Sequence, residues 1–257
     1  MHSDPLPAMT EALIGLGGQR VWSLLVSVFG DLAQHEGAGI DGPVLSAIMA
    51  RMGVKSEATR VALHRLRKDG WIASEKVGRT SRHRLTVYGR SETIAASGRI
   101  YAETQYAPEE WEIVITDGDE DRASLRSKGF VPVLPRVYLG TPALHAPENA
   151  LRLTGASTVP DWIKSQVAPD SLHQDYKKLR GILETTSRAL PETQSLQPLD
   201  IAVLRCLIVH NWRRLVLKQP DLPNALFPDD WEEVRCRALV TTLLNRFPRP
   251  QLEKLLR

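Results

Sequence analysis

The densest group of chemically active side chains in this sequence lies in residues 56–71, SEATRVALHRLRKDGW. At about 100° per residue, one side of a helix would carry four cationic residues: Arg60, His64, Arg67 and Lys68. Such groups form ion pairs and hydrogen bonds with phosphates, and an arginine can also pair with a guanine edge through two hydrogen bonds. The spacing therefore predicts a helix whose exposed face contacts a polyanion.

The opposite side of this predicted helix is narrow and apolar. Ala58, Ala62 and Leu66 line up along it, with Leu63 beside them. Because alanine side chains are small, this side can pack closely on a preceding helix. A solvated surface helix can also carry a cationic face, so the charge alone does not separate that alternative from polyanion binding.

A second basic segment follows directly. Two strand-like pieces, residues 71–76 and 84–87, flank the sequence VGRTS, and a glycine among small polar residues at this place indicates a β-hairpin. Its cationic residues are Lys76, Arg79, Arg82 and Arg84. A basic hairpin beside a basic helix favours nucleic acid, because the helix can enter a major groove while the hairpin follows the adjacent backbone.

The side-chain chemistry suggests a division of roles on DNA. We expect base-edge contacts from Arg60, His64 and Arg67, since one bidentate arginine–guanine pair is worth about 1–3 kcal/mol of discrimination. We expect phosphate contacts from Lys55, Ser56, Thr59 and Lys68. The hairpin cations would add phosphate or minor-groove contacts, which give affinity that falls with salt.

The segments before the basic helix make it the third of three helices. Apolar residues recur at helical spacing over residues 20–35, a second helix begins at Asp41-Gly-Pro43, and Ser56 is expected as the N-cap of the third. Three helices followed by a hairpin form the order of a winged helix-turn-helix domain, expected over residues 19–90. Residues 1–18 are expected to be a flexible tail.

The remainder of the chain divides into three parts. Residues 91–107 are expected to form a linker helix. Residues 108–170 carry a strand–helix–strand–strand order, which predicts a ferredoxin-like domain. Its segments are Trp111–Thr116, Arg122–Lys128, Phe130–Leu134 and Val137–Leu139. Residues 171–257 are helical, so the predicted fold class is a multidomain α+β protein.

The helical part contains two apolar stripes and one further helix start. The first stripe consists of Leu172, Tyr176, Leu179 and Leu183. The second consists of Ile201, Leu204, Leu207, Ile208 and Leu215. A last helix is expected to open at Asp229-Asp-Trp231, with Val234, Ala238 and Leu243 facing inward.

Charge and composition agree with these assignments. The net charge of the 257 residues is +3, but the span from Lys55 to Arg90 holds ten basic and three acidic residues, so the excess of positive charge is local. Cys206 and Cys236 stand in apolar contexts without metal-ligand spacing, which favours buried thiols over a disulfide. The apolar run Val21–Phe29 is too short to span a bilayer, and we expect a cytoplasmic protein.

Enzymatic alternatives find little support in the sequence. The acidic segment 117–121 lacks the glycine and terminal glutamate of a calcium loop. Asp117 after the first strand of the central part could belong to a metal-dependent nuclease, but no second ligand is apparent. The seven histidines show no metal-binding spacing, and no nucleophile motif is visible. We therefore expect no catalytic residue, no metal and no cofactor.

Several segments together resemble the PaaX-type transcriptional repressors that control phenylacetic acid catabolism in bacteria. The first runs from Arg60 to Ile72 and continues through VGRTS and Leu85-Thr86. Further matches are WEIVI from Trp111, LRSKGF from Leu125, LRCLIVHNWRR from Leu204, and the segment from Asp221 to Trp231. The similarity covers nearly the whole chain in the same order. The hairpin departs from the family, because Arg82-His83-Arg84 stand where aromatic residues are usual, and Lys218-Gln219-Pro220 replace an Asp-Pro.

The resemblance implies a homodimeric repressor that binds a partly palindromic operator in double-stranded DNA and is released by phenylacetyl-CoA. No glycine-rich phosphate loop marks an acyl-CoA site. We hypothesise a site between the central and C-terminal domains, lined by His210, Trp212, Arg213 and Arg214. The alternative is that the arginines form interdomain ion pairs and Trp212 lies in the core. Rival functions are the nuclease and a DNA-binding protein without an effector.

Overall fold

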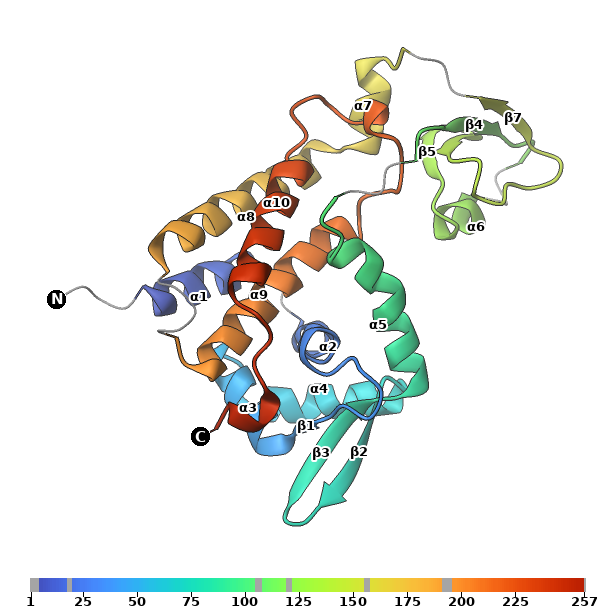
Figure 1. The fold of residues 1–257 in the computed structure, drawn as a ribbon. Coiled ribbons are helices and arrows are strands. Elements are labelled where there is room, and N and C mark those ends of the chain that lie inside the picture. Colours follow the sequence, from blue (N-terminus) through green and yellow to red (C-terminus); the bar gives the residue numbers. More distant parts are fainter. Residues whose placement is uncertain are drawn as a thin grey trace.

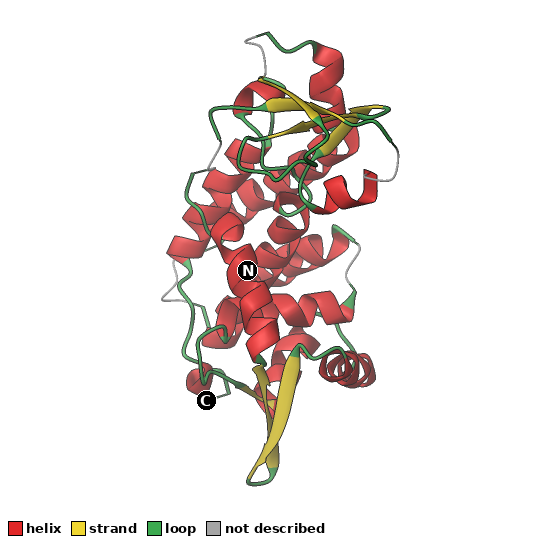
Figure 2. Ribbon diagram, turned by 90° about the vertical axis from the view of Figure 1, so that its right-hand side faces the viewer, coloured by secondary structure: helices red, strands yellow, loops and turns green. Residues whose placement is uncertain are grey.

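A computed structural model describes residues 5–17, 20–104, 108–118, 122–154, 158–190 and 196–256. A body of helices carries a two-stranded hairpin at one end and a small four-stranded sheet at the other (Figures 1 and 2). The fold is therefore of the mixed α and β kind that the sequence predicts.

The basic segments lie at the hairpin end. Three helices come first: α2 (Val21–Leu32), α3 (Gly42–Arg51) and α4 (Ser56–Lys68). The hairpin consists of β2 (Ile72–Val77) and β3 (Thr80–Leu85), and the short β1 (Ile40–Asp41), which the sequence analysis does not anticipate, pairs with β3. Gly78 has φ +60° at the first position of the two-residue turn, where glycine meets no steric penalty.

Helix α5 (Val87–Ile100) leads from the hairpin towards the sheet (Figure 1). Its first turn is fixed by Thr86, whose hydroxyl oxygen accepts a hydrogen bond from the Gly89 amide at 3.0 Å. Residue 89 must be glycine, because a Cβ there would lie 2.2 Å from the carbonyl oxygen of Trp71. The predicted linker helix is thus present but begins four residues earlier than expected.

The central sheet has the order β5-β6-β4-β7 with antiparallel neighbours. Its elements are β4 (Glu112–Ile115), α6 (Arg122–Ser127), β5 (Val131–Leu134), β6 (Val137–Gly140) and β7 (Leu151–Thr154). Helix α6 and β5 follow β4, and β6 inserts between the two strands, which agrees with the predicted order. The connection over residues 141–150 contains no helix, and β7 is not predicted, so the ferredoxin-like assignment stays a prediction.

The C-terminal half packs around one central helix, α9 (Pro198–Val216), which contacts α1, α2, α3, α5, α8 and α10. The other elements are α7 (Asp161–Val167), α8 (Asp170–Ala189), the 3-10 turns η2 (Asn224–Leu226) and η3 (Leu252–Lys254), and α10 (Glu233–Arg246). Both predicted stripes, on α8 and α9, are buried, as expected. One continuous core joins these helices to α2, α3 and α4.

The flexible tail expected over residues 1–18 is wrong for residues 5–17. Helix α1 (Leu6–Gly15) begins just after Pro5, and its side chains Leu6 and Leu13 are buried beside α8 and α9. A proline in the first turn starts a helix because the missing N–H would be unpaired there anyway. Residues 1–4 and 18 lie outside the described part of the chain.

The expected inward face of the last helix is also wrong. Helix α10 begins at Glu233, and Val234 and Ala238 are exposed. The buried face includes Glu233 and Arg237 instead, joined by an ion pair of 2.6 Å, together with Leu243 as predicted. A paired glutamate and arginine can replace apolar residues inside a core when their hydrogen bonds are made, and an apolar stripe does not reveal this.

A buried carboxylate holds the two ends of the chain together. Both carboxylate oxygens of Asp31 on α2 accept hydrogen bonds from Arg205 on α9 at 3.0 Å, and Tyr101 and Arg249 donate at 3.0 and 3.2 Å. The Arg205 guanidinium also donates to the Leu244 and Phe247 carbonyls at the C-terminal end of α10. Asp31 and Arg205 are 2% and 4% exposed, so each charge depends on the other.

We predict that Asp31→Asn lowers the free energy of unfolding by about 3–5 kcal/mol, because it leaves Arg205 buried without its counter-charge. Urea denaturation followed by circular dichroism measures the change. The control is Asp200→Asn, which breaks the 2.8 Å pair with the exposed Arg51 and should cost at most about 1 kcal/mol. Equal losses in the two variants would contradict the role given to Asp31.

Candidate nucleic-acid interface

Helix α4 presents its predicted cationic face to solvent. Its back is fixed by Ala62 and Leu66, which are 6% and 1% exposed in the common core. The residues predicted to read base edges, Arg60, His64 and Arg67, are exposed, as is Lys68. The structure thus brings these four side chains together on one solvent-facing side of α4.

The expectation for Thr59 is wrong. Its side chain is 5% exposed, on the buried side of α4, and its hydroxyl donates to the Lys55 carbonyl at 3.3 Å. Thr59 therefore cannot contact phosphate. Lys55 and Ser56 are exposed, but Ser56 is the first helical residue rather than the N-cap, a position that Lys55 holds without a side-chain hydrogen bond.

Two arginines of α4 pair with acidic residues about one turn away along the chain. Arg60 contacts Glu57 at 3.0 Å, with both side chains more than 70% exposed. Arg65 contacts Asp69 at 3.5 Å and lies over the ring of Trp22 on α2, 5.4 Å from its centroid. Such exposed pairs are weak and can exchange for other anions. Sequence reasoning gave Arg65 no role, and only the packing of α2 on α4 reveals its contact with Trp22.

The hairpin extends the basic surface. Lys76, Arg79 and Arg84 are exposed and Arg82 is half-buried. Arg84 contacts Glu75 at 3.4 Å, and Arg82 is 4.0 Å from Asp41, so part of the hairpin charge is balanced locally.

His83 between these arginines points inward. It is 6% exposed, and its Nδ1 lies 2.7 Å from the Ser74 hydroxyl. Burial, and then the nearby Arg67, lower the pKa of His83. A neutral His83 therefore fills the base of the hairpin, and the charge available to a polyanion comes from its neighbours.

The four residues hypothesised to line an effector site do not converge. Trp212 is fully buried, donates from its indole N–H to the Ile100 carbonyl at 2.9 Å, and packs against Arg237 and Tyr176. His210 is also fully buried, with its Nδ1 2.9 Å from the Ser27 hydroxyl. Burial and the charges of Arg213 and Arg214 lower the pKa of His210 to about 3.

The two arginines face the N-terminal elements rather than the central sheet. Arg213 donates to Ser27 on α2, and Arg214 donates to the Gly17 carbonyl after α1. The hypothesis that these four residues line one site between the central and C-terminal domains is therefore wrong. Because an α-helix has 3.6 residues per turn, neighbouring residues of α9 point towards different elements, and α9 contacts six other helices.

A cleft does lie between the sheet and the helices. It has a volume of about 1100 Å³, and its walls come from α5, β5, α7, α8 and the segment after α9. Three exposed cations border it: Arg126, Lys128 and Lys218. Among the described residues, no carboxylate oxygen lies within 4.0 Å of any of these three cationic groups. Its apolar wall includes Phe130, Leu144 and Leu172.

The sequence analysis considered a metal site and a disulfide, and the side chains concerned are as follows. Within the described residues, no group of three His, Cys, Asp or Glu side chains could hold a metal ion. Asp117 accepts a hydrogen bond from the Asn149 amide at 3.2 Å, while residues 119–121 of the acidic segment lie outside the described part. Cys206 and Cys236 are both buried free thiols, as expected. Across the described helices, none is long and apolar enough to cross a membrane.

Comparisons with known proteins agree in sequence and in fold. Transcriptional repressor PaaX of Escherichia coli (strain K12) is 28% identical over 253 residues, which cover 87% of this chain and 79% of that protein. The solved structure of uncharacterized protein Rv0674 from Mycobacterium tuberculosis is similar with a TM-score of 0.53 and 20% identity, over 87% of this chain and 95% of that one. At that identity the likeness concerns the fold alone.

Family models match both ends of the chain. The model described as PaaX-like protein matches residues 20–89, which include α2 to α4 and the hairpin. The model described as PaaX-like protein C-terminal domain matches residues 168–253, which include α8 to α10. Together the two models cover more than half of the 257 residues in the expected order, and the chain belongs to the PaaX-like protein family.

Proposed function

We propose that this protein is a DNA-binding transcriptional repressor and not an enzyme. The observation that carries the proposal is the exposed cationic face of α4, continued by a basic hairpin at the free end of the molecule (Figure 2). The similarity to Transcriptional repressor PaaX supports the same function. A repressor meets its operator in the cytoplasm, so the proposal includes that location.

In this proposal α2, α3, α4 and the hairpin form a winged helix-turn-helix. Helix α4 enters the major groove, where Arg60, His64 and Arg67 read base edges. Phosphate contacts come from Lys55, Ser56, Lys68 and the hairpin cations Lys76, Arg79, Arg82 and Arg84. Glu57 is exposed, so Arg60 can leave it for a base or phosphate at a cost of at most about 1 kcal/mol.

The proposal extends to assembly and control. Two copies would bind a partly palindromic operator, because a twofold dimer presents two equal helices to two half-sites. The regulated genes would serve the catabolism of an aromatic acid of the phenylacetate type. An aryl-acyl-CoA effector would release the protein by binding its DNA-free conformation more tightly, since only differential affinity shifts such an equilibrium.

The cleft beside the central sheet suits this effector better than the α9 residues do. An acyl-CoA carries several phosphate charges and an apolar acyl group, and the cleft offers Arg126, Lys128 and Lys218 next to Phe130 and other apolar side chains. Helix α5 borders the cleft through Arg99, which donates to the Val216 and Gln219 carbonyls. Since α5 begins at the hairpin, a change in the cleft has a direct mechanical connection to the DNA-binding end.

We predict that Arg60→Ala and Arg67→Ala each weaken binding to the DNA upstream of the protein's own gene by about tenfold, and that each weakens binding to unrelated DNA less, because each removes a contact with a base edge. Gel shifts on the two DNAs measure both effects. Arg188→Ala, a 78% exposed arginine on α8, controls for the change in net charge and should bind as wild type. Wild-type affinity in both α4 variants would mean that another face reads DNA.

For the cleft, we predict that the double variant Arg126→Ala, Lys128→Ala weakens binding of phenylacetyl-CoA by about tenfold or more, because two charge-assisted phosphate contacts are lost. Isothermal titration calorimetry on the full chain measures it. The control is Lys177→Ala, an exposed cation of α8 outside the cleft. Unchanged affinity in the double variant contradicts this location for the effector, while an unchanged gel shift without effector shows that DNA binding is intact.

A further inference from the structure

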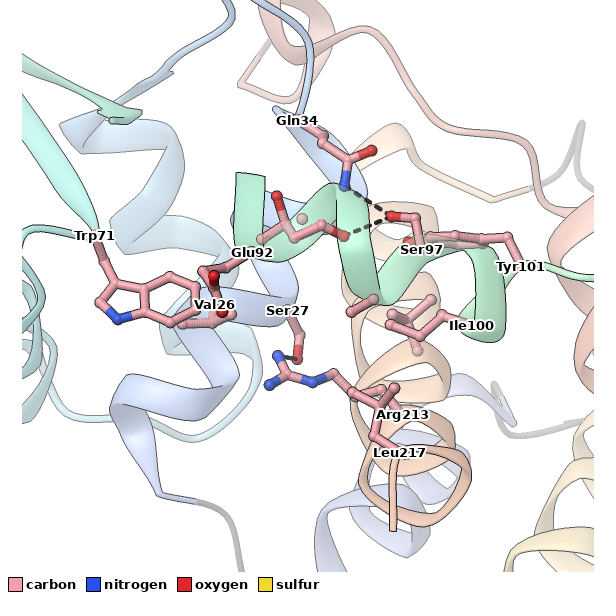
Figure 3. Close-up of a pocket in the computed structure, with 14 residues that line it drawn as sticks. Val26, Ser27, Gln34, Trp71, Glu92, Ser97, Ile100, Tyr101, Arg213 and Leu217 are labelled. Atoms are coloured by element: carbon pink, nitrogen blue, oxygen red, sulfur yellow. Dashed lines mark hydrogen bonds between the residues drawn. The ribbon is translucent and has the colours of Figure 1, made fainter. Parts of the chain in front are cut away.

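A second cavity, separate from the cleft, lies between α2, α5 and α9. It has a volume of about 190 Å³ and is lined by Ser27 of α2, Trp71 before the hairpin, Ala96 of α5 and Arg213 of α9, among others (Figure 3). Cavities of about 150 Å³ can hold a benzene ring, so this one suits a ligand of similar size. It is too small for the acyl-CoA considered for the cleft.

Arg213 is a half-buried cation whose hydrogen bonds go to neutral oxygens. Its guanidinium donates to the Ser27 hydroxyl at 3.1 Å and to the Ser23 carbonyl at 3.5 Å, and Figure 3 shows it directed towards Ser27. Across the described residues, no carboxylate lies within ion-pair distance of Arg213. Burial lowers the pKa of this guanidinium, which reflects the same lack of a counter-charge.

The arginines that are buried among the described residues, Arg205 and Arg237, are paired. Arg205 has Asp31 at 3.0 Å, and Arg237 has Glu233 at 2.6 Å. A buried charge without a partner is costly, so proteins normally supply one. Arg213 has no carboxylate within ion-pair distance among the described residues and also lines a cavity, and this coincidence indicates an anion supplied by a ligand.

The other residues that line the cavity indicate the polarity and charge of the rest of the ligand. Val26, Ala96, Ile100, Val209 and Leu217 make most of the lining apolar. The polar Ser97 is already satisfied, since it accepts from Gln34 and donates to the Thr93 carbonyl at 2.8 Å each. Glu92, exposed on the rim, would repel a second negative charge. The site therefore suits one negative charge on a small apolar body.

We propose that this cavity binds a small organic monocarboxylate, with its carboxylate paired to Arg213 and its apolar part among the side chains of α2, α5 and α9. The site goes beyond the proposed function, because it requires neither DNA nor an acyl-CoA. It adjoins the DNA-binding end, since the Trp71 amide donates to the Leu66 carbonyl of α4 at 2.8 Å. Occupation of the cavity would stiffen the contact between α4 and the helices behind it.

The test uses the full chain and sodium benzoate as the probe, with benzamide as its neutral isostere, at constant ionic strength in calorimetry and thermal denaturation. Benzoate should bind saturably and raise the melting temperature, and benzamide should bind at least about tenfold more weakly. Arg213→Gln should lose benzoate binding to the same extent. Arg214→Gln is the matched control, because the adjacent Arg214 donates to Gly17 outside the cavity and should bind as wild type.

A second variant, which fills the cavity, tests the site if Arg213→Gln folds poorly. Ala96→Leu retains the guanidinium but occupies the apolar space, so it should also weaken benzoate binding. Wild-type binding in either variant overturns the site. Equal stabilisation by benzamide, or by chloride or phosphate in place of benzoate, would show that the cavity does not select an organic carboxylate and would overturn the proposal. Failure of DNA binding in gel shifts would leave these outcomes unaffected.

Discussion

The bidentate contact of Asp31 with Arg205 fixes the position of α2 on α9, and most of the fold depends on that position. Asp31 sits near the end of α2, and its two oxygens receive donors from α9, from Tyr101 after α5 and from the C-terminal Arg249. A buried carboxylate needs these donors, because an unpaired charge in the core would be strongly unfavourable. Four segments far apart in the sequence must therefore meet at one point.

This arrangement explains how α4 can present so many charges although few of its side chains are buried. The buried residues of α4 are Thr59, Ala62 and Leu66, so the helix contributes little apolar surface to the core. Helices α2 and α3 cover its back, and α9 covers theirs, so the apolar stripe of α9 supports the DNA-binding elements from behind. The PaaX-like family models match the two ends of the chain separately, yet in the structure both ends share one hydrophobic core.

Helix α5 connects the hairpin to the large cleft. It is capped by Thr86 at the base of the hairpin, borders the small cavity along its length and reaches the large cleft through Arg99. The glycine at position 89 allows its first turn to lie against the Trp71 carbonyl, so the base of the hairpin and the helix are in close contact. In the function proposed above, a ligand in either cavity would contact this helix and would thereby link its occupancy to DNA affinity.

The sequence by itself determined the features that depend on neighbours along the chain. Helical spacing was sufficient for the stripes of α8 and α9 and for the cationic face of α4, because a periodic pattern reports which side of one helix is apolar. Glycine and small polar residues were sufficient for the hairpin turn. The similarity to PaaX-type repressors, spread along the chain in order, supplied the family.

Only the tertiary structure decided the features that depend on distant partners. Helix α1 and the strands β1 and β7 are stabilised by elements far away in the sequence, and apolar periodicity along the chain did not predict them. Thr59, Val234 and Ala238 were misplaced because packing and the buried pair of Glu233 with Arg237 determine which flank of a helix is covered. Arg213 and Trp212 are adjacent in sequence, yet one lines a cavity and the other fills the core, since successive helical residues point in different directions and the elements around α9 differ on each side.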